Sequence, residues 1–178
     1  EKYLRDNPNS REISKIIPEF HGNHVTVDVD FTRPANATAY AAKDVVSDGS
    51  IIEFNNCGRK LGGSGYITRV LLLTTQTTNV NLYKLHLYKV KPVVIADNAQ
   101  FSGPLIADRL KYLGHIDLDA LIIEGTGADV AYQQDTALRF KYECAEGDDK
   151  LYGILEVTAS FTPDSGQKYY IILGMDQN

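Results

Sequence analysis

His24-Val-Thr-Val-Asp-Val-Asp-Phe-Thr32 alternates between apolar and polar residues along its whole length. Its apolar side chains share one face: Val25, Val27, Val29 and Phe31. Its polar side chains share the other: Thr26, Asp28, Asp30 and Thr32. A period of two residues is typical of a β-strand with one face in a core and the other in water. The segment therefore predicts a half-buried strand.

The rest of the chain continues this pattern in short segments that are separated by turns rich in Gly, Pro and Asp. These segments are residues 45–46 with 50–54, 66–75, 81–88, 115–123, 136–144, 151–158 and 168–173. Regular short strands without a long helical segment predict an all-β fold, an antiparallel β-sandwich that is jelly-roll-like and has about eight strands. We assign this sandwich to residues 24–178, a length that suits one domain.

Two stretches depart from simple alternation. Residues 70–73, Val-Leu-Leu-Leu, are apolar throughout, which predicts a central strand of a packed sheet. In residues 105–113 the apolar residues Ile106, Leu110 and Leu113 have helical spacing, which predicts a short helix of about two turns that Gly114 ends.

Residues 1–23 form a polar N-terminal arm that precedes the first strand. Ser10 is a suitable N-cap for a possible short helix, and Pro18 stops it. An apolar stripe on so short a helix needs a surface to lie on, either the chain's own sandwich or a neighbouring subunit. The candidate partner-binding residues of the arm are Ile13, Ile16, Ile17 and Phe20.

Composition limits the classes of partner. The net charge of −5 argues against nucleic acid, and the lack of a long apolar run argues against a membrane. The two cysteines, Cys57 and Cys144, are predicted to be unpaired thiols of a protein folded in a reducing cytoplasm, although a single disulfide stays open. The 11 tyrosines fit strand propensity, and a tyrosine-lined contact surface is the alternative.

The histidines give no convincing site. His21 and His24, with Glu19, are a possible metal grip, but their spacing is unusual for a strand and no fourth ligand is near in sequence. His86 is predicted to lie on the solvent-facing side of its strand, opposite Leu85 and Leu87. We therefore expect no metal and no cofactor.

Two carboxylate pairs and one glycine-rich loop are equally weak candidates. Asp28 with Asp30 and Asp117 with Asp119 resemble the pairs of glycosidases or Ca²⁺ sites, but they also occupy the polar positions of amphipathic strands. Gly62-Gly-Ser-Gly65 lacks the Lys-Ser/Thr of a phosphate-binding loop and is followed by a strand. The sequence thus predicts no catalytic residue and no enzyme.

An ordered set of motifs nevertheless resembles a known family. The longest is Asp30-Phe-Thr-Arg-Pro-Ala-Asn-Ala-Thr-Ala-Tyr-Ala-Ala-Lys-Asp-Val-Val46, followed by Gly62-Gly-Ser-Gly-Tyr-Ile67. Shorter ones are Leu85-His-Leu-Tyr88, Ile95-Ala-Asp-Asn-Ala99, Glu146-Gly-Asp-Asp149, Leu151-Tyr-Gly153 and Phe161-Thr-Pro163. This set resembles small virion structural proteins of tailed bacteriophages and prophages.

The resemblance implies a head auxiliary protein, a capsid decoration or cement protein that binds and bridges major capsid subunits. The implied location is the capsid surface of a virion assembled in the host cytoplasm. Its partners would be the major capsid protein or other virion proteins, and a homo-oligomer is expected. The alternatives are a tail, neck or fibre-attachment protein, or a carbohydrate-binding module.

Overall fold

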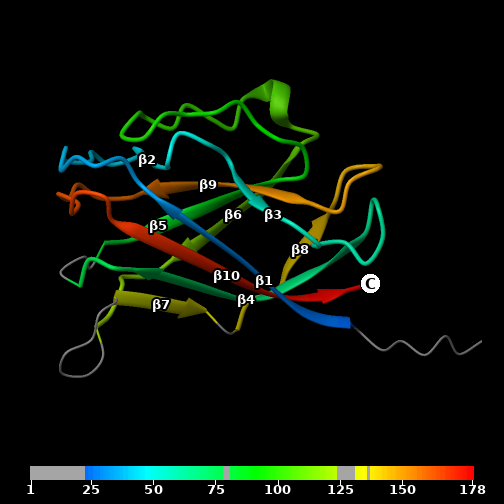
Figure 1. Cartoon of the computed structure of the whole chain (residues 1–178). Helices are drawn as coiled ribbons and strands as arrows, with labels where there is room; N and C mark the ends of the chain where they lie inside the picture. Colours follow the sequence, from blue (N-terminus) through cyan, green and yellow to red (C-terminus); the bar gives the residue numbers. More distant parts are fainter. Residues whose placement is uncertain (1–22, 78–80, 124–130, 136) are drawn as a thin grey trace, which may run out of the picture.

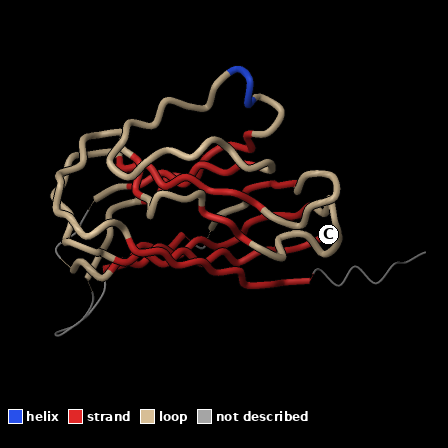
Figure 2. The backbone as a smooth tube through the Cα atoms, turned by 45° about the horizontal axis from the view of Figure 1, so that its top comes forward, coloured by secondary structure: helices blue, strands red, loops and turns tan. Residues whose placement is uncertain are grey.

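The computed structural model describes residues 23–77, 81–123, 131–135 and 137–178 (Figure 1). Within these residues the chain forms ten strands in two five-stranded antiparallel sheets that face each other (Figure 2). The candidate arm residues Ile13, Ile16, Ile17 and Phe20, and the predicted short helix, lie outside the described residues. The first strand begins at Asn23, one residue before the predicted start of the sandwich.

The first sheet is built around two long neighbouring strands, β10 and β4. Its strands are β1 (Asn23–Thr32), β10 (Lys168–Gln177), β4 (Ser64–Thr74), β7 (Ala131–Asp135) and β8 (Phe140–Glu143). β10 lies between β1 and β4, and both β7 and β8 pair with β4. The strand predicted at residues 136–144 forms as the shorter β8, and β7 is a separate strand that precedes it.

The second sheet is more compact. Its strands are β2 (Val45–Val46), β3 (Ile52–Phe54), β9 (Leu151–Val157), β5 (Tyr83–Tyr88) and β6 (Tyr112–Leu118). β2 and β3 both pair with β9, which pairs with β5, and β5 pairs with β6.

The strand order identifies the topology. β2 and β3 can be counted as one interrupted strand, and so can β7 and β8. The fold then has eight strands in two four-stranded sheets. In chain order the sheets then run 1-8-3-6 and 2-7-4-5. Two sheets of four strands connected in this way are a jelly roll, so the predicted jelly-roll-like sandwich is confirmed.

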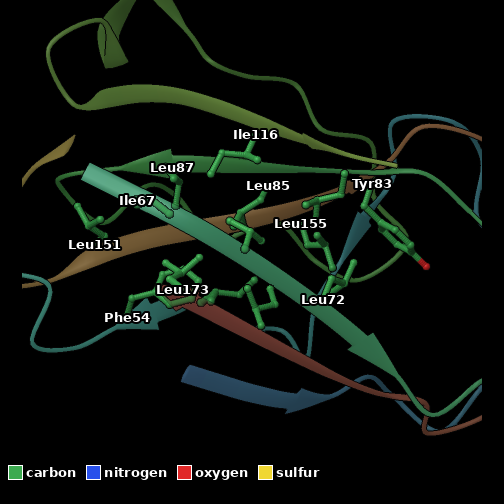
Figure 3. Packing of buried hydrophobic residues seen from close by; sticks show 14 of the residues in the cluster. Phe54, Ile67, Leu72, Tyr83, Leu85, Leu87, Ile116, Leu151, Leu155 and Leu173 are labelled. Atoms are coloured by element: carbon green, nitrogen blue, oxygen red, sulfur yellow. The ribbon is translucent and has the colours of Figure 1, made fainter. Parts of the chain in front are cut away.

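The core lies between the two sheets, where apolar side chains from both interdigitate (Figure 3). Leu72 and Leu173 from the first sheet and Leu85 and Leu155 from the second are fully buried. Burying each such side chain stabilises the fold by roughly 1.5–3 kcal/mol. In β1 the polar residues are exposed and the apolar ones are buried or half-buried, as the alternation predicts.

The predicted helix at 105–113 is wrong. Only the 3₁₀ helix η1 (Ile106–Asp108) forms there, and β6 already begins at Tyr112. Ile106 and Leu110 are exposed, so these two residues find no surface within the described part of the chain that would stabilise a helix. Gly114, expected to end the helix, instead lies within β6 at φ +128°, a conformation that favours glycine.

Two further expectations need correction. His86 is buried, at 5% exposure, because a long connection covers the side of β5 that alternation predicts to face water. Residues 70–73 do lie in a central strand, but burial alternates there: Val70 and Leu72 are fully buried, whereas Leu71 and Leu73 are only partly so. In the described part of the chain, no helix is long and apolar enough to cross a membrane.

Candidate contact surface

The connection between β5 and β6, residues 89–111, forms an extra layer on the second sheet. Figure 1 shows it in green above β9, β5 and β3, and Figure 2 shows η1 at its outermost point. Its underside packs on an apolar cluster that is separate from the main core. That cluster consists of Val45, Ile51, Tyr88, Phe101, Tyr152 and Ile154, with Ile95 and Tyr112 at its border.

Backbone hydrogen bonds fix this layer in place. The Phe101 N–H donates to the Lys43 carbonyl at 2.7 Å, and the Asn98 N–H donates to the Val45 carbonyl at 2.9 Å. The Val45 N–H in turn donates to the Ala99 carbonyl at 2.9 Å. The connection therefore presents its outer surface on a rigid support rather than as a free loop.

This layer carries most of the exposed large apolar side chains of the described structure. Among the described residues, six of the ten large apolar side chains that are exposed belong to it. We call them the apolar ridge: Val90, Val93, Val94, Leu105, Ile106 and Leu110. Val93 and Ile106 are 85% and 84% exposed. Single exposed apolar residues are normal, but their concentration on one supported segment marks an interaction surface.

Basic groups accompany the apolar ridge. Lys89 pairs with Glu143 and Lys91 pairs with Glu53, and the Arg109 guanidinium donates to the Ile106 carbonyl of its own turn at 3.2 Å. Asp108 accepts from the Leu105 N–H at 3.3 Å and so is used within η1. The charges of Lys89 and Lys91 are thus already compensated, so the exposed apolar side chains rather than charge distinguish this surface.

Arg33 holds the layer to the rest of the sandwich from below. Its side chain is completely buried, and one guanidinium nitrogen lies 3.1 Å from a carboxylate oxygen of Asp97, which belongs to the 89–111 connection. Its Nε donates to the Tyr40 hydroxyl at 2.8 Å, and that hydroxyl donates to Asp97 at 2.5 Å. Burial raises the pKa of Tyr40 well above its usual range, so the hydroxyl keeps its proton.

The same guanidinium reaches two more segments. It donates to the Asn36 side chain at 3.1 Å and to the Asp164 carbonyl at 3.1 Å. Arg33, Asn36, Tyr40 and Asp97 all belong to the motifs that carry the family resemblance. These motif residues therefore have a structural role, because they join three loops beneath the apolar ridge.

A second buried polar group lies under the connection at His86. Its Nε2 is 2.7 Å from a carboxylate oxygen of Glu156, and its Nδ1 is 3.0 Å from the Tyr112 hydroxyl. The ring of Phe101 packs on the imidazole, with centroids 4.1 Å apart. Burial lowers the pKa of His86 below its ordinary value, although Glu156 acts in the opposite direction.

This lowered pKa predicts acid sensitivity. Because the unfolded chain binds the His86 proton more readily, the free energy of unfolding should fall as the pH drops below about 6.5 towards the lowered pKa. We expect a slope of up to about 1.4 kcal/mol per pH unit from this group. Urea unfolding at pH 7.5, 6.5 and 5.5 measures it. His86→Gln should reduce the slope of unfolding free energy against pH. His24→Gln is the control, because His24 belongs to an exposed pair, and it should leave the slope unchanged. Equal slopes in the wild type and both variants would contradict the prediction.

The candidate catalytic carboxylates occupy exposed positions on or directly after the described strands. Asp28 and Asp30 are exposed on β1. Asp117 is 70% exposed and forms loose pairs with Lys84 at 3.7 Å and His115 at 3.6 Å. No group of three or more metal-ligating side chains forms within the described part of the chain.

The remaining candidates have structural roles. His24 bonds to Asp176 at 2.8 Å on the surface. Gly65 lies against the Asp176 carbonyl and the Tyr142 hydroxyl, where a Cβ would clash, so the glycine-rich loop serves packing. Cys57 and Cys144 are buried and free, and burial raises the pKa of their thiols to about 12 and about 11. Such thiols are poor nucleophiles near neutral pH.

The apolar ridge is the feature that sequence reasoning misses. In sequence, residues 92–104 resemble an ordinary loop, and the spacing of Ile106 and Leu110 predicts a packed helix stripe. The available signal is the run Val93-Val-Ile95 between two prolines, which is too apolar for a solvated loop. The alternative of a tyrosine-lined surface stays untested: Tyr66, Tyr112 and Tyr170 are partly exposed, whereas the exposed large apolar side chains in the described residues are all Leu, Ile or Val.

Comparison with known proteins adds little to these observations. No family model and no curated protein matches the sequence. Among solved structures, the chain is similar to one of Turnip yellow mosaic virus, with 10% identity, a TM-score of 0.28 and coverage of 91% of this chain and 85% of that chain.

Two further similarities are to other viruses. A full particle of Israeli acute paralysis virus heated to 63 degree has 11% identity and a TM-score of 0.31, over 98% of this chain and 79% of that chain. The coat protein of Tobacco streak virus has 14% identity and a TM-score of 0.21, over 84% and 86%. At such scores the fold assignment rests on the strand order of this chain itself.

Proposed function

We propose that this chain is a virion structural protein of a tailed bacteriophage, a capsid decoration or cement protein that binds and bridges major capsid subunits. The observation that carries the proposal is the apolar ridge, an exposed apolar surface on a jelly roll that holds it rigidly. Jelly rolls occur in viral capsid and lectin domains, so the fold agrees with the proposed role. The phage-like motifs supply the partner class.

The physical mechanism is contact area rather than chemistry. A rigid apolar ridge loses little conformational entropy on binding, so more of the buried area becomes binding free energy. Bridging two subunits by one protein adds avidity, since the second contact forms at high effective concentration. The acidic net charge of the chain suits a position outside the shell rather than against packaged DNA.

A tail, neck or fibre-attachment protein would use the same surface, and stoichiometry separates the two roles. Quantitative mass spectrometry of purified particles should find hundreds of copies of this chain, in a fixed ratio to the major capsid protein. A dozen copies or fewer would place the protein in the tail or neck and overturn the decoration role. A carbohydrate-binding role is less well supported, because the described surface lacks exposed aromatic platforms.

The arm gives a separate prediction. We propose that Ile13, Ile16, Ile17 and Phe20 contact a neighbouring subunit, and that residues 1–23 are an arm outside the sandwich. Deleting Glu1 to Gly22 should leave the far-ultraviolet circular dichroism of a folded β-protein and weaken binding to particles at least tenfold. An unfolded deletion product would show instead that these residues belong to the core.

A further inference from the structure

β1 is an unprotected edge strand of the described structure. It pairs with β10 through an uninterrupted register of ten residues, from Asn23 with Gln177 to Thr32 with Lys168, and no described strand lies on its other side. Such an edge presents a row of N–H and C=O groups that can pair with an added strand. No proline, lysine or bulge interrupts β1, and its charged residues Asp28 and Asp30 lie on the exposed face of the strand.

A preformed groove runs beside the first half of this edge. Its volume is about 580 Å³, and it is lined by Asn23, Val25, Thr26, Val27, Asp28, Asn55, Asn56, Gly58, Arg59 and Gln177. Gln177 fixes its shape: it donates to the Asn56 carbonyl at 2.7 Å and accepts from the Asn23 side chain at 3.0 Å. The groove thus lies between β1 and the segment that follows β3.

The position of the arm indicates the occupant. The arm joins β1 at Asn23, which itself lines the groove. If two copies are related by a two-fold axis with their grooves face to face, the arm of each copy begins beside the groove of the other copy. Each arm can then enter the groove of its partner. The arm carries four basic and four acidic residues, so it approaches an acidic body without net repulsion.

The chain's own arm fits the groove less well. A two-residue reversal at His21-Gly22 would place Pro18 opposite Val25, within the added strand, where proline is disfavoured because it cannot donate to the ladder. The arm of another copy is not joined to this β1 by a tight turn, so it can pair in a register that keeps Pro18 outside the added strand. Its residues 9–17 contain no proline, and in extended form they span about 30 Å, which is enough to cover the part of β1 that lines the groove, residues 23–28.

We infer that the groove beside β1 binds residues 9–17 of a second copy as an added strand, in a reciprocal exchange of arms. These residues are then extended, in place of the short helix that the isoleucine spacing predicts. This self-association does not depend on where in the virion the protein acts, so it can fail while the decoration role stands.

Photo-crosslinking of the full chain tests the inference. A benzophenone amino acid replaces Thr26, which is exposed and lines the groove, and the protein is mixed with an equal amount of ¹⁵N-labelled chain. We expect crosslinked peptides that join position 26 of one copy to residues 1–22 of the other. Crosslinks within one copy, crosslinks elsewhere, or none would overturn the proposal.

Sedimentation equilibrium gives an independent measurement. Thr26→Trp fills the groove and should raise the dissociation constant of the dimer at least tenfold. Thr32→Trp is the matched control, because Thr32 is exposed on the same face of β1 and lies outside the groove. A wild-type chain that stays monomeric, or equal constants for the two variants, would overturn the exchange of arms.

Discussion

We expect Asp97→Ala to lower the free energy of unfolding by about 3–5 kcal/mol, the cost typical of removing one partner of a buried ion pair. The Arg33 side chain is completely buried and Asp97 is 7% exposed, so water cannot replace the missing carboxylate. The Tyr40 hydroxyl and the Ser47 N–H lose the same acceptor. This destabilisation is a large share of the 5–15 kcal/mol by which domains are usually stable, roughly a third.

Urea unfolding at neutral pH measures the effect. Asp117→Ala is the control, since Asp117 also pairs with a cation but is 70% exposed, and its removal should cost under about 1 kcal/mol. If Asp97→Ala cost no more than the control, the motif residues would not form a stabilising network.

The second large effect concerns binding. Val93→Asp combined with Ile106→Asp should weaken binding to particles that lack this protein about 100-fold, which is about 1.4 kcal/mol for each of the two side chains. Both side chains are more than 80% exposed, so the free energy of unfolding should change by less than about 0.5 kcal/mol per site. Binding is measured by co-sedimentation with the particles.

A matched control introduces the same charge elsewhere. Leu61 and Ile122 are 65% and 49% exposed and lie outside the 89–111 connection. Leu61→Asp combined with Ile122→Asp should therefore leave particle binding unchanged within about threefold. If both double variants weakened binding equally, added negative charge rather than the apolar ridge would be responsible.

Much of the fold could be predicted because β-strand alternation is a local signal. The segment at residues 24–32 shows the period of two, and the structure buries the predicted face. His86 shows the limit of that signal: alternation defines two faces, but it does not reveal that residues 89–111 cover the second one. His86 is on the face that alternation predicts to be solvent-exposed, yet it is buried and bonds to Glu156.

The apolar ridge was harder to predict, because it depends on apolar side chains that have no neighbouring surface to pack on. The spacing of Ile106, Leu110 and Leu113 is the same for a helix that packs and for a chain that leaves Ile106 and Leu110 in solvent. Only the tertiary structure distinguishes the two. The buried network could not be predicted either, since Arg33 and Asp97 are far apart in sequence and no local pattern links them.

The most direct test of the central claim is a cryo-electron microscopy reconstruction of the assembled particle. We predict density for this jelly roll repeated over the head lattice, with the 89–111 connection facing the major capsid subunits and spanning two of them. Density confined to the tail or neck would contradict the decoration role, and so would a head position in which the apolar ridge faces solvent.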